Sequence, residues 1–360
     1  MPNEKIVYTT PEQQLEKLKA QKLIIDDERF ALDSLKVFGY SNLIKSYREP
    51  YTYIKDTKKQ YRSDVTFEQI YSLFILDKNL RNAVMASMLD LEEHIKEIAA
   101  EVVASSFGIH QNKYLSYKNY RDRKTGNKKF TLKNILKTMR ETLNTTKEPI
   151  FHYNNKYGLV PPWILFKSIY LSTIINYIKM FKRSEQEEMV SLLYDFDSLN
   201  LNMQQCRMLM MDTLFISYEY RNIAAHGGRI YNYSCNAKLR STEIFGASPE
   251  INPFSGFSQL LFLLSLLKYQ SPYDRLETTL TDEINRHCKM YPQDVTYLGQ
   301  ILNIDITKQT IVFLSPKKNI YHSNEHCSGM QNALSIRLEK AMKMGFIPCK
   351  KCCSFNFNEL

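Results

Sequence analysis

An arginine, an asparagine and a histidine near residue 225 are the side chains best suited to chemistry. Arg221, Asn222 and His226 occur in the segment YRNIAAHGGRIYN, residues 220–232. A histidine can accept and donate a proton near neutral pH, and an arginine binds phosphate oxygens with a planar fork of N–H donors. The set predicts RNA cleavage with the 2′-hydroxyl as nucleophile, so DNA should be inert and no metal is required.

Each of the three residues has a role in this hypothesis. His226 would move a proton, Arg221 would stabilise charge on a phosphorane-like transition state, and Asn222 would orient the histidine or the phosphate. The alternative is structural, because arginine and histidine near the end of a helix complement its dipole and cap its last carbonyls. The spacing of one arginine and one histidine does not decide between these two interpretations.

A helix must position the motif. Over residues 205–226 apolar side chains recur at three- and four-residue steps, at Leu209, Met210, Leu214, Phe215 and Tyr218; this pattern predicts a helix with one buried face. Two glycines at 227–228 should end the helix. Five residues at about 100° each would place the arginine and the histidine on adjoining faces, about 7–8 Å apart along the axis.

Further motifs in a fixed order surround this one. They are Leu35, Phe38-Gly39-Tyr40, Leu43 and Tyr47; Phe67 to Tyr71; Asp77 to Arg81; Leu89 to Glu93; Pro162-Trp163; and Arg229 to Asn232 after the central motif. Together they resemble the Abi family of bacterial abortive-infection proteins, of the AbiD/AbiF type, over residues 8–290. One departure is residues 168–172, where relatives often carry a phenylalanine-glycine turn.

The resemblance implies a HEPN ribonuclease domain in a phage-defence, toxin-like system. HEPN ribonucleases pair two Arg/His motifs across a two-fold interface, and this chain has one clear copy, so a homodimer would supply the second. In such domains an acidic residue on a neighbouring helix can pair with the arginine. Glu92, Glu93 and Glu97 are the candidates, although a solvated face with Lys96 nearby is the alternative.

The composition agrees with an RNA partner. Lys and Arg outnumber Asp and Glu by 48 to 38, a net charge of +10, which favours nucleic acid or an anionic surface as partner. The longest apolar run, residues 260–267, is too short to span a membrane and predicts a buried helix over 258–269. No signal peptide is visible. We therefore expect a cytoplasmic protein without membrane contact, and the sequence shows no glycine-rich loop for a small-molecule cofactor.

Positive charge is concentrated between residues 113 and 147. This segment has eleven Lys or Arg and two acids, with Tyr114, Tyr117 and Tyr120 interleaved. Lysines and arginines neutralise phosphates, and tyrosines stack on unpaired bases, so the segment predicts an RNA-binding surface. A solvated loop is the alternative. The predicted RNA-binding residues are Lys118, Arg121, Arg123, Lys124, Lys128, Lys129 and, beyond this segment, Arg229.

The C-terminus predicts a zinc site. Two short strands, at 310–314 and 320–322, should precede a helix over 333–344. Cys349 and Cys352 form a C-x-x-C knuckle of the kind that binds one zinc ion, and the stretch is similar to the metal-binding module of the Ada type. That resemblance implies His322 and Cys327 as the other ligands, although His326 competes with His322. Free thiols and a redox pair are the alternatives.

The fold class expected is mainly α, a HEPN-type bundle with an N-terminal helical extension and a small C-terminal α+β zinc module. The expected divisions are an N-terminal helical part at 1–60, a HEPN-type domain at 61–302 with the basic insertion 113–147, and a zinc module at 303–360. Two alternatives to a nuclease stay open. One is an RNA-binding protein in complex with a structured regulatory RNA, and the other is a non-catalytic HEPN scaffold.

Overall fold

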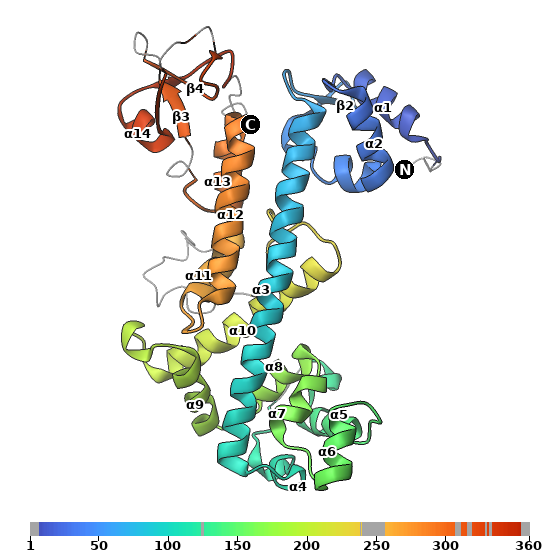
Figure 1. Cartoon of the computed structure of the whole chain (residues 1–360), viewed down its shortest axis with the longest axis vertical. Helices are drawn as coiled ribbons and strands as arrows, with labels where there is room; N and C mark the ends of the chain where they lie inside the picture. Colours follow the sequence, from blue (N-terminus) through green and yellow to red (C-terminus); the bar gives the residue numbers. More distant parts are fainter. Residues whose placement is uncertain are drawn as a thin grey trace. The chain divides into compact units, whose positions relative to one another are not determined.

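The computed structural model describes residues 7–123, 126–237, 239, 256–306, 311–314, 319–327, 330 and 333–353. The chain is mainly helical with a small C-terminal sheet, as predicted (Figure 1). It divides into two compact units, of which unit 1 comprises residues 1–81 and 278–360 and unit 2 comprises residues 82–277. The helices α3 (Phe67–Phe107) and α12 (Ser271–Met290) contribute to both units.

Unit 2 contains the predicted Arg/His motif and the basic segment. Its other helices are α4 (Gln111–Tyr114), α5 (Leu132–Leu143), α6 (Ile150–Tyr157), α7 (Pro162–Leu165), α8 (Leu171–Lys179), α9 (Arg183–Leu193), α10 (Met203–Ala225) and α11 (Phe257–Ser265). Single helical turns η3 (Tyr117–Asn119), η4 (Lys128–Phe130), η5 (Phe166–Ser168) and η6 (Phe196–Ser198) lie between them.

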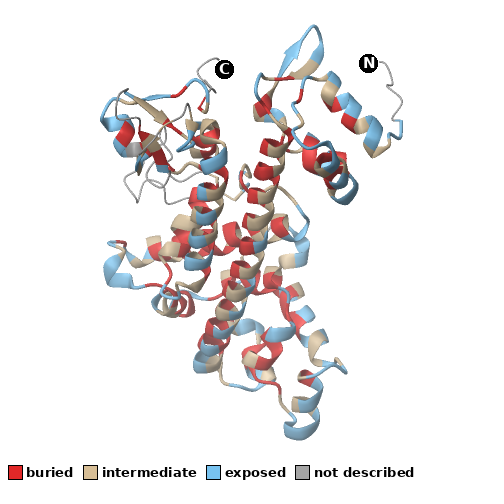
Figure 2. Ribbon diagram, turned by 45° about the horizontal axis from the view of Figure 1, so that its top comes forward, coloured by how far each residue is buried: buried red, intermediate tan, exposed pale blue. Residues whose placement is uncertain are grey.

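The helix α10 forms the core of unit 2 and confirms the helix predicted at 205–226. It begins with a capping box, in which Asn202 Oδ1 accepts from the Gln205 backbone at 3.0 Å and Gln205 Oε1 accepts from the Asn202 backbone at 2.9 Å. It packs against α8, α9 and α11 (Figure 1). Its buried residues extend beyond a single stripe and include Leu209, Met210, Leu214, Ile216 and Tyr220. Figure 2 shows the buried residues of the chain in red.

Unit 1 combines helices with two small sheets. The N-terminal part contains α1 (Pro11–Ala20), α2 (Glu28–Phe38), the turns η1 (Ser41–Lys45) and η2 (Glu49–Tyr51), and the hairpin β1 (Thr52–Lys55) with β2 (Lys58–Tyr61). The C-terminal part contains η8 (Pro292–Asp294), α13 (Val295–Leu302), β3 (Ile311–Leu314), β4 (Ile320–His322), β5 (Leu334–Arg337), α14 (Leu338–Lys343) and β6 (Ile347–Pro348). The last four strands form a sheet in the order β5-β3-β4-β6.

One predicted element and one alternative differ from the structure. The helix predicted over 333–344 is a strand up to Arg337 and a helix only from Leu338, because residues 334–337 pair antiparallel with β3. The solvated loop, which was the alternative for the basic segment 113–147, does not describe the whole segment. Its C-terminal part is the amphipathic helix α5, which buries Leu132, Ile135, Leu136 and Met139.

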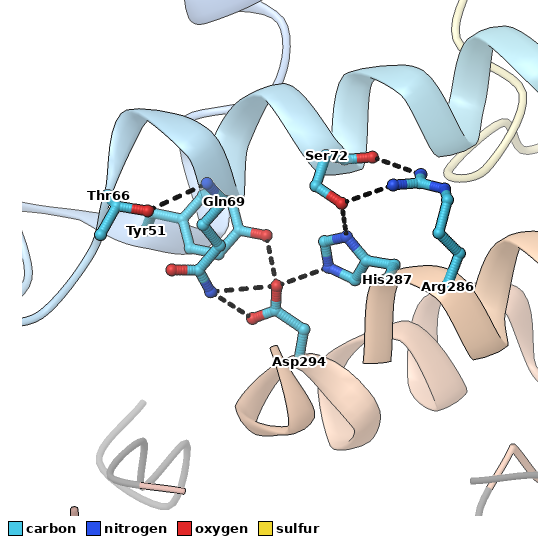
Figure 3. A network of polar contacts seen from close by, with 7 residues as sticks. All are labelled: Tyr51, Thr66, Gln69, Ser72, Arg286, His287 and Asp294. Atoms are coloured by element: carbon cyan, nitrogen blue, oxygen red, sulfur yellow. Dashed lines mark hydrogen bonds and ion pairs between the residues drawn. The ribbon is translucent and has the colours of Figure 1, made fainter. Parts of the chain in front are cut away.

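A buried carboxylate organises unit 1. Asp294 accepts hydrogen bonds from the Tyr51 hydroxyl at 2.7 Å and from the Gln69 side-chain amide at 3.0 Å, and His287 Nε2 lies 2.8 Å from it (Figure 3). The other imidazole nitrogen of His287 lies 2.9 Å from the Ser72 hydroxyl. Asp294 and His287 are 0% exposed. The Ser-His-Asp series resembles a hydrolase triad in composition, but its complete burial excludes substrate and makes it structural.

Loss of this carboxylate should destabilise unit 1. Asp294→Ala leaves buried donors on Tyr51, Gln69 and His287 without their acceptor, and should lower the free energy of unfolding by about 3 kcal/mol. Urea unfolding followed by circular dichroism measures the change. Asp282→Ala, on the exposed face of α12, is the control and should change stability by less than about 0.5 kcal/mol. Equal stability of the two variants would contradict the structural role of Asp294.

Candidate functional site

The motif lies where α10 ends, and two glycines form that end. His226 is the C-cap residue, and the N–H of Gly227 donates to the Ala224 carbonyl at 3.2 Å. The N–H of Gly228 donates to the Ile223 carbonyl at 2.9 Å. These two bonds define a Schellman motif, which requires a left-handed residue after the C-cap. Gly227 is that residue, with φ of 71°.

Gly228 is required for a different reason. A Cβ atom at this position would lie 2.7 Å from Ile223 Cγ2 and 3.2 Å from the Ile223 carbonyl oxygen. A side chain here would therefore open the helix end, because the contact with the backbone oxygen cannot relax by a rotamer change. The two glycines together determine the direction in which the chain leaves the helix, and hence the position of His226.

The three motif side chains differ in exposure. His226 is exposed, whereas Arg221 and Asn222 are half-buried. Arg221 Nη1 donates to Asn222 Oδ1 at 3.4 Å. Arg221 Nε is buried and has no hydrogen-bond partner among the described residues. A guanidinium that keeps an unsatisfied buried N–H is able to receive an anion.

Glu219 holds the segment that follows the motif, a role the sequence interpretation missed. Its carboxylate accepts from the Tyr233 hydroxyl at 3.1 Å, the Cys235 thiol at 2.9 Å and the backbone N–H groups of Asn236 and Ala237 at 2.8 and 2.9 Å. Burial acts to raise the pKa of this carboxyl, but the hydrogen bonds outweigh burial and lower it. A single acid before the arginine carries no sequence signal for this role.

Tyr220 anchors the same segment from the core side. Its buried ring packs edge-on against Tyr233, with ring centroids 5.3 Å apart, and its hydroxyl donates to the Tyr233 carbonyl at 3.4 Å. Ile230 and Tyr231 are also buried. The residues after the motif are thus packed against the end of α10, with Arg229 half-buried.

The acidic residues proposed as partners of Arg221 do not contact it. Glu92 forms an ion pair with Lys96 at 2.8 Å, and within the described part of the chain neither Glu92, Glu93 nor Glu97 is paired with Arg221. All three line a separate cavity of about 720 Å³ together with Trp163. Glu93 and Glu97 are exposed, as the solvated-face alternative expected. The side chains of Glu92 and Lys96 are each only 14% exposed, and Glu92 Oε2 is buried without a hydrogen-bond partner among the described residues.

The predicted RNA-binding residues fall into two groups. Lys118, Lys128 and Lys129 are exposed at the surface, whereas Arg121 and Arg123 line a second cavity. Lys124 lies outside the described residues. Two of the tyrosines expected to stack on bases are unsuited to it, because Tyr114 and Tyr120 are 0% and 5% exposed and belong to the core.

The four predicted metal ligands are close together in unit 1. The ligand atoms of His322, Cys327, Cys349 and Cys352 lie within 4.8 Å of one another. The Sγ atoms of Cys327 and Cys349 are 4.0 Å apart, and Cys352 Sγ lies 3.6 Å from His322 Nδ1. Ligands at about 2.0–2.3 Å from a tetrahedral zinc ion require separations of about 3.5–4 Å. The cluster can therefore hold a metal ion.

Backbone contacts position these ligands. The Cys349 N–H donates to the Tyr321 carbonyl at 2.9 Å, which joins the knuckle to the strand that ends in His322. The Lys351 N–H donates to Cys349 Sγ at 3.4 Å. The Cys353 thiol, 3.9 Å from Cys352 Sγ, lowers the pKa of the Cys352 thiol, which favours the thiolate that a metal needs. His326, with its side chain 83% exposed and 3.6 Å from Glu325, lies outside the cluster.

The chain combines a mainly helical fold with an Arg-Asn-x-x-x-His motif at the end of α10. The family described as "Abi-like protein" matches residues 33–232, and the chain belongs to this family. Membership indicates a role in abortive infection, a phage-defence response. No curated protein and no solved structure matches the chain. Among the described residues, no helix has both the length and the apolar character needed to cross a membrane.

Removal of the Glu219 charge should weaken unit 2 in a pH-dependent way. The pKa of Glu219 is lower in the folded chain than in the unfolded chain. The ionised carboxylate therefore adds to the free energy of unfolding above the unfolded pKa of about 4.3, and this addition is lost as the pH falls through the folded pKa. Glu219→Gln should therefore lower the free energy of unfolding by about 1–2 kcal/mol at pH 7 and by progressively less below about pH 4. Urea unfolding followed by the fluorescence of Trp163 measures this difference.

The matched control is Glu187→Gln, which removes the surface ion pair with Arg183. It should lower the free energy of unfolding by less than about 0.5 kcal/mol. A cost at Glu219 that stays constant from pH 7 to pH 3 would contradict a role for the ionised carboxylate.

Proposed function

We propose that this protein is a metal-independent endoribonuclease that acts in abortive infection. The observation that carries the proposal is the end of α10, where Arg221 keeps a buried Nε without a partner among the described residues and His226, five residues further along the chain, is exposed. RNA carries its own nucleophile, the 2′-hydroxyl, so a proton acceptor and a phosphate-binding cation suffice for cleavage. DNA is not a substrate of this reaction.

In the proposed reaction, a neutral imidazole of His226 removes the proton of the 2′-hydroxyl as that oxygen attacks phosphorus. The bond from phosphorus to the 5′-oxygen breaks, and an imidazolium returns a proton to the leaving oxygen. The products are a 2′,3′-cyclic phosphate and a 5′-hydroxyl. Arg221 stabilises the negative charge on the non-bridging oxygens, and Asn222 orients the guanidinium through its side-chain oxygen.

A homodimer completes the proposed site. One histidine cannot be base and acid in the same instant, and a second copy of the motif supplies the other proton-transfer group. Two-fold symmetry is the commonest arrangement of such assemblies. His226 is exposed at a helix end, which leaves it accessible to a second copy and to RNA.

A second candidate function is RNA binding without cleavage, with a structured regulatory RNA as the partner. The exposed Lys118, Lys128 and Lys129 and the net charge of +10 favour it, since lysines neutralise phosphates without sequence preference. This function predicts RNA that copurifies with the protein, is released by salt and stays intact.

For the C-terminal cluster we propose a structural zinc ion held by His322, Cys327, Cys349 and Cys352. Three thiolates and one imidazole are ligands that zinc prefers, and four protein ligands leave no open position for substrate. A sheet of such short strands buries little apolar surface, so the ion would contribute much of the stability of this module.

Cleavage in EDTA tests the nuclease. Purified protein should cut total and transfer RNA and leave 2′,3′-cyclic phosphate ends. His226→Ala should lower the rate about 10²–10⁴-fold, and Arg221→Ala should lower it about 10²–10³-fold. End-group analysis and gel electrophoresis measure products and rates.

The matched control variants are His152→Ala and Arg183→Ala, which replace an exposed histidine and an exposed arginine elsewhere in unit 2. Both variants should cut RNA at the wild-type rate. If wild type binds RNA without cutting it, the regulatory-RNA function replaces the nuclease. If the Arg221 and His226 variants cut like wild type, the proposed site is wrong.

Metal analysis tests the zinc site. Inductively coupled plasma mass spectrometry of the purified chain should find about one zinc per chain. Cys349→Ser should lower the zinc content to background, because it removes one of four ligands. Cys353→Ser, the neighbouring thiol outside the ligand set, should retain the metal. Zinc loss in both variants, or in neither, would contradict the assigned ligands.

A further inference from the structure

A second cavity in unit 2 concentrates positive charge. Its volume is about 530 Å³, within the range of small-ligand sites. Arg121, Arg123, Lys179 and Arg207 line it. Asp212 is the one acidic residue among the described residues of its lining, and its side chain is buried. The cavity is therefore strongly cationic.

Two of these half-buried arginines keep a buried N–H group at a cost in folding free energy. The Nε atoms of Arg123 and Arg207 are buried and have no hydrogen-bond partner within the part of the chain that the structure describes. Burial lowers the pKa of Arg123, and the positive charges of Arg121 and Arg207 lower it further. Crowded guanidinium groups with unsatisfied N–H donors cost folding free energy, which an anion in the cavity would offset.

The cavity is preformed by the core around it. The Arg121 N–H donates to the Met180 carbonyl at the end of α8 at 2.8 Å. The preceding residue, Tyr120, is buried and hydrogen-bonds through its hydroxyl to that of Tyr177. Gln186, which also lines the cavity, donates to the Ile178 carbonyl at 3.3 Å. Arg121 is thus held by α8, while Arg207 projects from α10.

The apolar part of the lining comes mainly from α10, with Ala237 beyond that helix, and Gln204 of α10 adds a polar group. Met208, Met211 and Phe215 of α10 provide thioether and aromatic surface, which suits a planar base. Arginine forks bind phosphate in pairs of hydrogen bonds. The combination of a phosphate-binding side and an apolar side in one cavity matches the two parts of a nucleotide.

We propose that this cavity binds a phosphorylated nucleotide, with its phosphate on Arg121, Arg123 and Arg207 and its base against Met208, Met211 and Phe215. The nucleotide is either free or the 5′-phosphorylated end of an RNA. The site is distinct from the Arg221/His226 motif, since Arg207 precedes Arg221 by about 21 Å along α10. Binding here does not depend on the proposed cleavage reaction.

Isothermal titration calorimetry of the full chain tests the proposal, with His226→Ala as the background so that RNA stays intact. The probes are ATP, AMP, inorganic phosphate, and one short RNA with either a 5′-phosphate or a 5′-hydroxyl. Arg207→Met and Arg123→Met should weaken nucleotide binding at least about tenfold, and Arg207→Lys should weaken it less. Lys133→Met, which removes an exposed charge of α5, should leave binding unchanged.

Thermal unfolding separates lost binding from lost folding. Without ligand, Arg207→Met should unfold at or above the wild-type temperature, because it relieves repulsion among the arginines, and ligand should raise the midpoint of wild type only. Binding of ATP or AMP supports a free nucleotide, and binding only of 5′-phosphorylated RNA supports an RNA end. The proposal is overturned if no probe binds, if inorganic phosphate binds as tightly as ATP, or if Arg207→Met binds the nucleotide as tightly as wild type does.

Discussion

The burial of α10 is the constraint on which unit 2 depends. This helix contributes core residues from several of its faces, packs against α8, α9 and α11, and begins and ends with defined caps. Its rotation and length are therefore determined by packing rather than by the residues proposed to do chemistry. Arg221 and His226 at one end and Arg207 nearer the other take their positions from the same rigid element, which is how a buried helix can support two polar sites.

Unit 2 keeps buried guanidinium N–H groups that no described residue satisfies. Arg123, Arg207 and Arg221 each have a buried Nε without a hydrogen-bond partner among the described residues. A protein selected only for stability would satisfy or remove such groups, because each unsatisfied donor costs free energy. Glu219 shows that the same helix can satisfy an ionised group fully, with four donors. The contrast supports anion binding at the arginines and a structural role for Glu219.

Unit 1 uses polar interactions for stability in two different ways. Around Asp294, hydrogen bonds from Tyr51, Gln69 and His287 satisfy a fully buried carboxylate, so the cluster resembles a catalytic triad only in residue types. At the C-terminus, one histidine and three cysteines lie within ligand distance of one another in a module with short strands. In the first case apolar packing surrounds the polar cluster, whereas in the second a metal ion would replace the missing core.

The sequence by itself determined the helical class and the helix α10 with its glycine stop, because both follow from local periodicity and capping. Its resemblances indicated the family and the candidate residues of the C-terminal cluster, and the structure places His322 rather than His326 in that cluster. Only the tertiary structure decided which side chains share a site. Tyr114 and Tyr120 looked like stacking residues but fill the core, and Glu92 pairs with Lys96 rather than with Arg221. Glu219 anchors residues that follow it by 14 to 18 positions. Arg121, Arg123 and Arg207 line the same cavity although they are distant in sequence. Neither arrangement can be predicted from local periodicity, because both depend on the tertiary fold.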